Sequence, residues 1–159
     1  MKPDWVINAS AYTAVDKAES DSVAAYSVNA IGPEILARCC AELGAKLIHI
    51  STDYVYPGEG SAPLIEDDAV GPTGVYGASK LAGELLVSRA CPEHIILRTA
   101  WVFGASGGNF VKTMLRLGAD REHLTIVSDQ WGGPTSAVGI AGAIATMIGV
   151  VTDRDAGSE

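Results

Sequence analysis

The fold is decided by one stretch near the middle of the chain, Lys46-Leu47-Ile48-His49-Ile50-Ser51, together with the residues that follow it, Thr52-Asp53-Tyr54-Val55-Tyr56. The first part is short and largely apolar, which predicts a buried strand of a parallel sheet. Ligands of such sheets bind beyond the carboxyl ends of the strands. We therefore expect Thr52 and Asp53 to lie at a binding site.

Beyond a loop that contains proline and glycine stands a second motif, Tyr76-Gly77-Ala78-Ser79-Lys80. A helix over residues 75–89 would place Tyr76 and Lys80 on one face, one turn apart. The ammonium would favour the phenolate and lower the pKa of the tyrosine from about 10 toward neutrality. With the Thr52 hydroxyl holding a carbonyl oxygen and Tyr76 protonating it, this set suits the reduction of a ketone by hydride. Taken alone, a tyrosine and a lysine at this spacing more often lie on a solvated helix face.

The remaining sequence alternates predicted strands with predicted helices. We expect buried strands at 5–9 and 95–99, a further short strand at 124–127, and helices at 20–43, 75–88, from 109 onward and at 137–151. Alternation of this kind with short loops is typical of a parallel sheet. We therefore predict the α/β class, with a partial Rossmann-type doubly wound parallel sheet in a single domain over residues 1–159.

Two of these helices carry more detailed expectations. The 20–43 helix has Ser20 or Asp21 as a candidate N-cap and Gly44 as its stop. Within it, Gly32-Pro33 should produce a kink or split it into two abutting helices. The 137–151 segment is uncharged but shorter than the ~20 residues that cross a bilayer, so we predict a buried helix and no membrane partner.

Composition narrows the function classes. The chain has 11 Lys and Arg against 19 Asp and Glu, a formal net charge of −8 and no basic cluster, which argues against nucleic acid as a partner. Its 3 cysteines form no disulfide framework and no Cys/His spacing suits a metal, so we expect a reduced, cytoplasmic protein. The start of the sequence does not resemble a signal peptide. Glu66, Asp67 and Asp68 fit a solvated acidic loop better than a cation site.

Two further motifs follow, Arg98-Thr99-Ala100-Trp101-Val102-Phe103 and Asp129-Gln130-Trp131-Gly132-Gly133-Pro134-Thr135. In order and spacing, the four motifs resemble the extended short-chain dehydrogenase/reductase superfamily. More narrowly, they resemble the dTDP-4-dehydrorhamnose reductase family, from about residue 4 to about residue 145. The resemblance implies reduction of dTDP-4-dehydrorhamnose to dTDP-L-rhamnose with NADPH or NADH, a step toward cell-surface polysaccharides.

The resemblance also implies roles for particular residues. The implied catalytic residues are Thr52, Tyr76 and Lys80. The implied cofactor-binding residues are Ala11, Tyr12, Thr13, Tyr76 and Lys80. Those implied to bind the dTDP-sugar are Thr52, Asp53 and Trp101, and Asn29 is expected to make a structural hydrogen bond near the site. Without the resemblance, residues 10–13 would be a plain turn before a helix, and Trp101 could equally be core.

The sequence departs from that family in its extent. Family members have a glycine-rich phosphate loop after their first strand, and no such loop precedes Trp5 here. We therefore expect a form without the N-terminal glycine-rich segment and the C-terminal region, with an exposed sheet edge that a homo-oligomer would cover.

Two alternatives stay open. One is another sugar-nucleotide epimerase or reductase of the superfamily. Asp53-Tyr54 argues against a 4,6-dehydratase, because dehydratases resemble one another in having Asp-Glu after the threonine. The other is a non-catalytic fragment or a regulatory, ligand-binding member of the superfamily.

Overall fold

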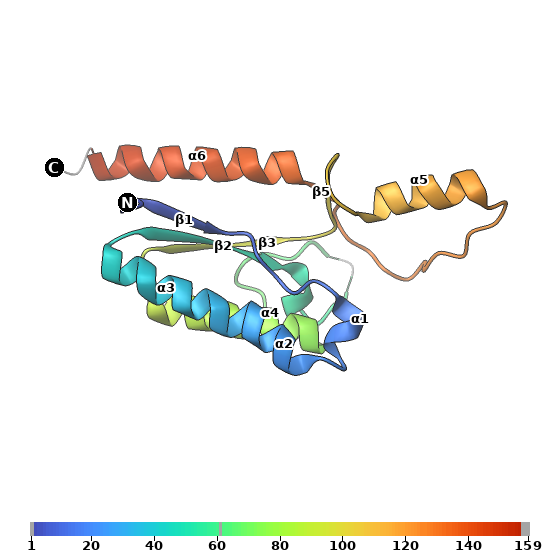
Figure 1. The fold of residues 1–159 in the computed structure, drawn as a ribbon, viewed down its shortest axis with the longest axis horizontal. Coiled ribbons are helices and arrows are strands. Elements are labelled where there is room, and N and C mark those ends of the chain that lie inside the picture. Colours follow the sequence, from blue (N-terminus) through green and yellow to red (C-terminus); the bar gives the residue numbers. More distant parts are fainter. Residues whose placement is uncertain (1, 61, 157–159) are drawn as a thin grey trace. The chain divides into compact units, whose positions relative to one another are not determined.

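The computed structural model describes residues 2–60 and 62–156. The chain divides into two compact units, Met1–Thr99 and Ala100–Glu159, which are described separately here (Figure 1). The boundary falls directly after the last strand of the first unit.

The first unit contains a three-stranded parallel sheet in the order β1-β2-β3, formed by Trp5–Asn8, Lys46–Thr52 and His94–Thr99. The central strand β2 is the most buried, as predicted, and Thr52 is its last residue. The other two strands are less buried than predicted, because each has a strand on one side only in the part of the chain that the structure describes. In β1 only Asn8 is buried and Ile7 is 48% exposed, and β3 is half-buried throughout.

The helix predicted over 20–43 is three consecutive helical segments. They are α2 at Ser22–Tyr26, a π-helical turn η1 at Ser27–Ile31, and α3 at Gly32–Leu43. Pro33 has no N–H to donate to the preceding turn, so the regular hydrogen-bond ladder is interrupted just before it. Asp21 is the N-cap residue, and Gly44 ends α3 with a left-handed φ of 65°, both as predicted. The short helix α1 at Val15–Ala18 was not predicted.

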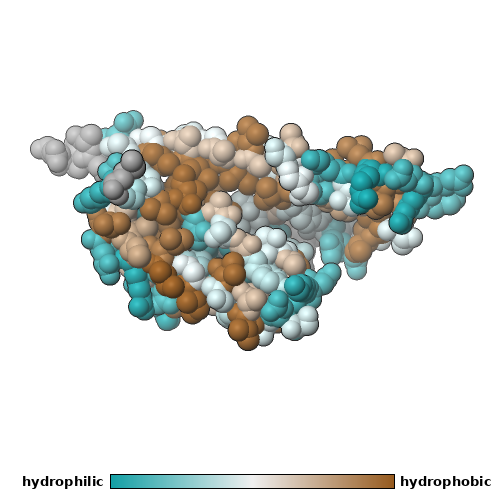
Figure 2. Space-filling view, viewed as in Figure 1, coloured by the Kyte–Doolittle hydropathy of each residue, from teal (hydrophilic) through white to brown (hydrophobic). Residues whose placement is uncertain are grey.

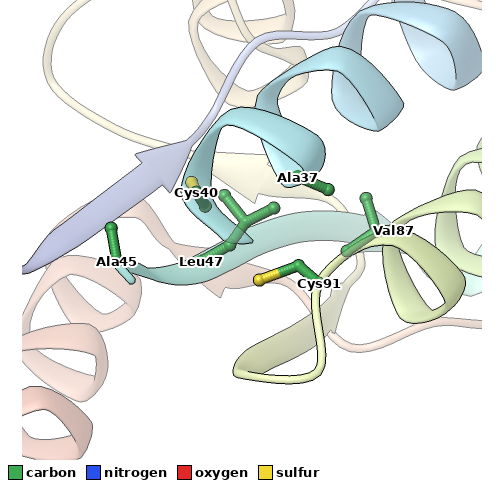
Figure 3. Packing of buried hydrophobic residues seen from close by; sticks show 6 residues of the cluster. All are labelled: Ala37, Cys40, Ala45, Leu47, Val87 and Cys91. Atoms are coloured by element: carbon green, nitrogen blue, oxygen red, sulfur yellow. The ribbon is translucent and has the colours of Figure 1, made fainter. Parts of the chain in front are cut away.

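Two helices cover one face of the central strand. Helix α4, Val75–Ala90, extends two residues beyond the predicted end and packs against α3 and β2. Figure 3 shows their common core, which consists of Ala37, Cys40, Ala45, Leu47, Val87 and Cys91. The small alanine and cysteine side chains let both helices lie close to the sheet. All three cysteines are free thiols in the structure, with Cys39 exposed and Cys40 and Cys91 buried.

Apolar side chains are also exposed on the outer side of the first unit. They lie on α2, η1 and α3 and include Val23, Ile31 and Ile35, which are 83%, 49% and 56% exposed. The apolar surface of these helices can be followed in Figure 2.

The second unit is built on a two-stranded parallel sheet of β4, Val102–Phe103, and β5, Thr135–Ser136. Helix α5 spans Phe110–Asp120 and is capped by Asn109, whose side chain accepts a 3.1 Å bond from the Lys112 amide. The strand predicted at 124–127 is wrong. This segment is irregular, with Ile126 52% and Val127 66% exposed, and no strand in the described part of the chain pairs with it.

Helix α6, Ala137–Ala156, confirms the predicted helix but not its burial. Of its apolar stretch Ala137–Arg154, only 6% is buried. Residues 137–151 have no charged side chain on any side of the helix, so the sequence cannot show whether a surrounding layer covers it. By length and composition this stretch could also cross a membrane, which is weak evidence because core helices of soluble proteins meet the same criteria.

Candidate active site

Thr52 stands at the carboxyl end of β2, where the sequence placed it. It is 6% exposed, and its hydroxyl donates to Asp53 Oδ1 at 3.1 Å and accepts from the Tyr54 amide at 3.3 Å. These bonds begin the short 3₁₀ turn η2, Asp53–Val55, and fix the orientation of the hydroxyl. Burial raises the pKa of the half-buried Asp53 carboxyl.

Tyr76 and Lys80 occupy the first turns of α4 and are buried, with exposures of 9% and 1%. A solvated helix face is therefore excluded for this pair. The Lys80 ammonium donates to the carbonyl oxygen of Ile50 at 2.6 Å, which anchors it beside the end of β2. The ring of Tyr76 meets the ring of Tyr54 edge to face, with 5.5 Å between centroids.

The pKa of Tyr76 moves in the direction opposite to the one predicted. Burial raises this pKa above 10.0. The neighbouring Thr52 hydroxyl lowers it, and the charges of Asp53 and Tyr54 raise it further. Desolvation of the phenolate outweighs any attraction by Lys80, whose own pKa burial lowers to about 8. The Tyr76 phenol consequently stays protonated at neutral pH, the form that can donate a proton.

The loop that follows β1 is tied to α4 through Asn29, which is fully buried on η1. The Asn29 side chain accepts from the Tyr12 amide at 2.8 Å and donates to the Tyr12 carbonyl at 3.1 Å and to Ser79 Oγ at 3.0 Å. Ser79 in turn donates to the Tyr76 carbonyl at 2.7 Å. The structural hydrogen bond expected of Asn29 is present, and it joins two parts of the predicted site.

The three predicted cofactor residues of this loop differ in their surroundings. Tyr12 packs against the buried cluster that contains Tyr76, together with Ala18 and Ala25. Ala11 is half-buried and Thr13 is exposed. The loop therefore lies at the carboxyl end of β1 with Tyr12 next to Tyr76.

An ion pair between the buried Glu84 and the half-buried Arg98 was missed by the sequence reasoning. Arg98 on β3 donates two hydrogen bonds to the carboxylate of Glu84, from Nε to Oε1 at 3.0 Å and from Nη2 to Oε2 at 2.7 Å. Ser51 also donates to Glu84 Oε1, at 2.5 Å, and Arg98 Nη1 donates to the Tyr56 hydroxyl at 2.7 Å. The one signal in the sequence was the position of Glu84 one turn after Lys80, whereas the pairing of Ser51 with Arg98 is visible only in the sheet.

His49 is a second group that sequence reasoning missed. It is fully buried on β2, and its Nδ1 lies 3.0 Å from Asn8 Nδ2. Asn8 Oδ1 accepts from both the amide and the hydroxyl of Ser10, so the Asn8 amide nitrogen is the donor toward His49. His49 is then neutral with its proton on Nε2, an atom without a partner in the described structure. Burial, with the nearby Lys80 charge, lowers its pKa to about 4.

Trp101 belongs to the second unit and brings two motifs together. Its carbonyl accepts from the Thr135 amide at 3.3 Å, and its ring lies so close to Gly132 that a Cβ there would be 2.9 Å from Cε2. The side chain is 46% exposed, which excludes the core alternative. Its φ of 45° is uncommon for a residue with a side chain. Its binding role stays a prediction.

No group of three metal-ligating side chains is present among the described residues. The carboxylates of the acidic loop are not gathered into such a group.

Comparison with known proteins gives a consistent result. The model of the RmlD substrate binding domain family matches residues 1–158. A dTDP-4-dehydrorhamnose reductase of Escherichia coli K12 is 47% identical over 154 residues, which are 97% of this chain and 52% of that protein. This chain thus spans about half the length of the curated relatives it matches.

Solved structures agree with the sequence comparison. The crystal structure of a dTDP-4-dehydrorhamnose reductase from Clostridium acetobutylicum is 48% identical and superimposes with a TM-score of 0.90, over 92% of this chain and 52% of that one. The reductase of Bacillus anthracis, solved in complex with NADP, is 43% identical with a TM-score of 0.90 over the same shares. These neighbours confirm the predicted partial Rossmann-type α/β fold. Because the family match extends over nearly every residue, the chain belongs to the RmlD substrate binding domain family.

Proposed function

We propose that this chain is part of a reductase that converts dTDP-4-dehydrorhamnose to dTDP-L-rhamnose with NADPH or NADH. The observation that carries the proposal is the place of the buried, protonated Tyr76 beside the carboxyl end of β2, where its ring contacts Tyr54 and Thr52 binds the Tyr54 amide. Relatives named for this reaction are 47% identical to the chain. The buried position of Lys80 one turn from Tyr76 supports the same assignment.

The residues have distinct tasks in this reaction. The reduced nicotinamide, when bound, supplies the hydride that adds to the carbonyl carbon at C4 of the sugar. Tyr76 gives its phenolic proton to the carbonyl oxygen, so that the ketone becomes an alcohol, and is reprotonated from solvent. Thr52 turns the single hydrogen of its hydroxyl from Asp53 to the same oxygen and orients it. Lys80 supplies the positive charge that stabilises the phenolate left by proton transfer.

The described residues fit the nicotinamide end of such a cofactor. The loop at residues 11–13 is held beside Tyr76 by Asn29, and the ammonium of Lys80 uses one of its three hydrogens on Ile50, leaving donors for ribose hydroxyls. The pyrophosphate end is normally held by the backbone amides of a glycine-rich loop at a helix N-terminus. The 159 residues contain no such loop before β1.

Asp53 and Trp101 are proposed to contact the dTDP-sugar. Asp53 is half-buried beside the Thr52 hydroxyl, and Trp101 offers a half-exposed indole face. An aromatic face of this kind packs well on a sugar or a base. We further propose a cytoplasmic protein that acts on this small molecule without nucleic acid or membrane, as a homo-oligomer that covers the open sheet edge.

The direct test is an assay of a completed protein. The chain would be joined to those segments of the Escherichia coli relative that lie outside the matched 154 residues. We expect oxidation of NADPH that depends on dTDP-4-dehydrorhamnose and yields dTDP-L-rhamnose.

The same assay separates the reductase from the other reading of the sequence, a non-catalytic binding member of the superfamily. Binding of cofactor and sugar nucleotide by the completed protein without turnover would support that alternative and overturn the reductase.

A further inference from the structure

Two buried side chains of α4, Lys80 and Glu84, and the half-buried Arg98 of β3 carry charge where α4 packs on the sheet. Lys80 is 1% exposed and Glu84 is 4% exposed, and they lie one turn apart on the same face of α4. The guanidinium of Arg98 approaches from β3 and binds both oxygens of Glu84. Among these three groups the formal charge is therefore two positive and one negative.

Removing the carboxylate would leave the buried Lys80 ammonium without the negative charge one turn away, and the half-buried Arg98 guanidinium without its partner. A guanidinium does not lose its proton in proteins, whereas a buried lysine readily does. Lys80 is the group that would become neutral. Glu84 makes no hydrogen bond to Tyr76 or Thr52 in the described structure, and its charge lies one turn from Lys80 on α4.

We propose that Glu84 is a positioning residue that keeps the Lys80 ammonium charged, and that Arg98 limits this effect by binding the same carboxylate. The role of that charge in reduction rests on the proposed function. The electrostatic relation itself does not, because it concerns only groups of this chain.

The surroundings leave Lys80 as the group that titrates near neutral pH. Burial lowers its pKa to about 8, and Glu84 raises it. From β2, His49 faces Lys80 with a pKa of about 4 and stays neutral above pH 6. From α4, Tyr76 has a raised pKa, as stated above, and from β3 Arg98 stays charged because Glu84 raises its pKa.

The test is an NMR titration of the Lys80 side chain in the 159-residue chain, with the resonance assigned by its loss in Lys80→Arg. In Glu84→Gln, which keeps the shape and loses the charge, the pKa of Lys80 should fall by about one pH unit or more. In Arg98→Met, which frees the Glu84 carboxylate, the pKa of Lys80 should rise. Ser51→Ala removes a hydrogen bond to Glu84 but changes no charge. The pKa of Lys80 in this variant should stay within a few tenths of a unit of its original value.

The double variant Glu84→Gln/Arg98→Met removes both charges, and its Lys80 pKa should lie between those of the two single variants. A dispersed amide spectrum identifies the variants that fold. If Glu84→Gln does not fold, the rise of the Lys80 pKa in Arg98→Met is the test of the proposal. An unchanged pKa in either folded single variant, or a shift of the opposite sign, overturns the proposal.

In the completed protein, the alkaline limb of the turnover profile should move with the Lys80 pKa. If the pKa moves and the limb does not, Glu84 still controls Lys80, and the assignment of Lys80 to the reaction is wrong. The failure of this inference and that of the proposed function therefore give different results.

Discussion

The α-carbon of Gly83 lies directly against the carbonyl oxygen of Asn29, so that a Cβ on Gly83 would fall well inside van der Waals contact with that oxygen. This close approach brings the π-turn η1 onto α4 and allows the Asn29 side chain to reach Ser79. Gly83 is thus required by the packing that joins the loop after β1 to the helix of Tyr76.

Gly83→Ala should lower the free energy of unfolding by about 1–3 kcal/mol, the usual cost of overpacking, despite the better helix propensity of alanine. Gly142→Ala in α6 is the matched control, because no other group lies near its Cβ position. That change should be neutral or stabilising by up to about 1 kcal/mol. Urea denaturation measures both, and equal effects would mean that the contact with Asn29 is not tight.

The lowered pKa of the buried His49 predicts that the free energy of unfolding falls in acid. Its folded pKa of about 4 is below the ordinary 6.5, so the unfolded state binds the proton more strongly. The stability it contributes is fully present above pH 6.5 and is lost as the pH falls from 6.5 toward 4, by at most about 3 kcal/mol. Carboxylates titrate at the lower end of this range, so the informative quantity is the difference between the chain and His49→Gln. Parallel stability curves for the two proteins would show that His49 is not held neutral.

The proposed contact of Trp101 with the dTDP-sugar predicts that removing its ring weakens ligand binding. In the completed protein, Trp101→Ala should weaken binding of the sugar nucleotide by about tenfold or more, since an aromatic contact contributes ~0.5–1.5 kcal/mol beyond its burial. Trp101→Phe keeps a flat ring and should recover most of the affinity. Calorimetric titration separates the two variants. Wild-type affinity in Trp101→Ala would remove this residue from the substrate site.

The 159-residue chain on its own should bind NADPH weakly and show no reductase turnover. Its contacts reach the nicotinamide end, and the amides that hold the pyrophosphate are not among its residues. Losing three charge-assisted hydrogen bonds at ~1.5–3 kcal/mol each would weaken a micromolar site past millimolar. Calorimetry with NADPH tests this, and micromolar binding would show that the described residues hold the cofactor by themselves or with a second copy.

The sequence predicted the first unit better than the second. The β2 strand, the α4 helix and the stop at Gly44 follow from local pattern, because an apolar run, a helical period and a glycine each act through near neighbours. In the second unit, β4 and β5 are two residues long and pair across more than thirty positions, which leaves no local signal. The apolar run at 124–127 met the criteria for a strand, yet no partner strand pairs with it.

The site shows the same division. Thr52, Tyr76 and Lys80 could be proposed as site residues because their motifs are compact in sequence. The ion pair of Glu84 with Arg98 depends on the register of β3 beside β2, and only the fold reveals it. The raised pKa of Tyr76 was missed because helix spacing shows which groups are neighbours but not how deeply they are buried.

The central claim is that Tyr76 is the proton donor of a carbonyl reductase, and turnover of Tyr76→Phe in the completed protein tests it most directly. Phenylalanine keeps the ring that packs against Tyr54 and removes only the hydroxyl. We predict a loss of turnover of at least ~100-fold, the lower end of general acid contributions, with the affinity for the sugar nucleotide little changed. Turnover close to that of the unsubstituted protein would contradict the account and leave the spacing of Tyr76 and Lys80 without a catalytic meaning.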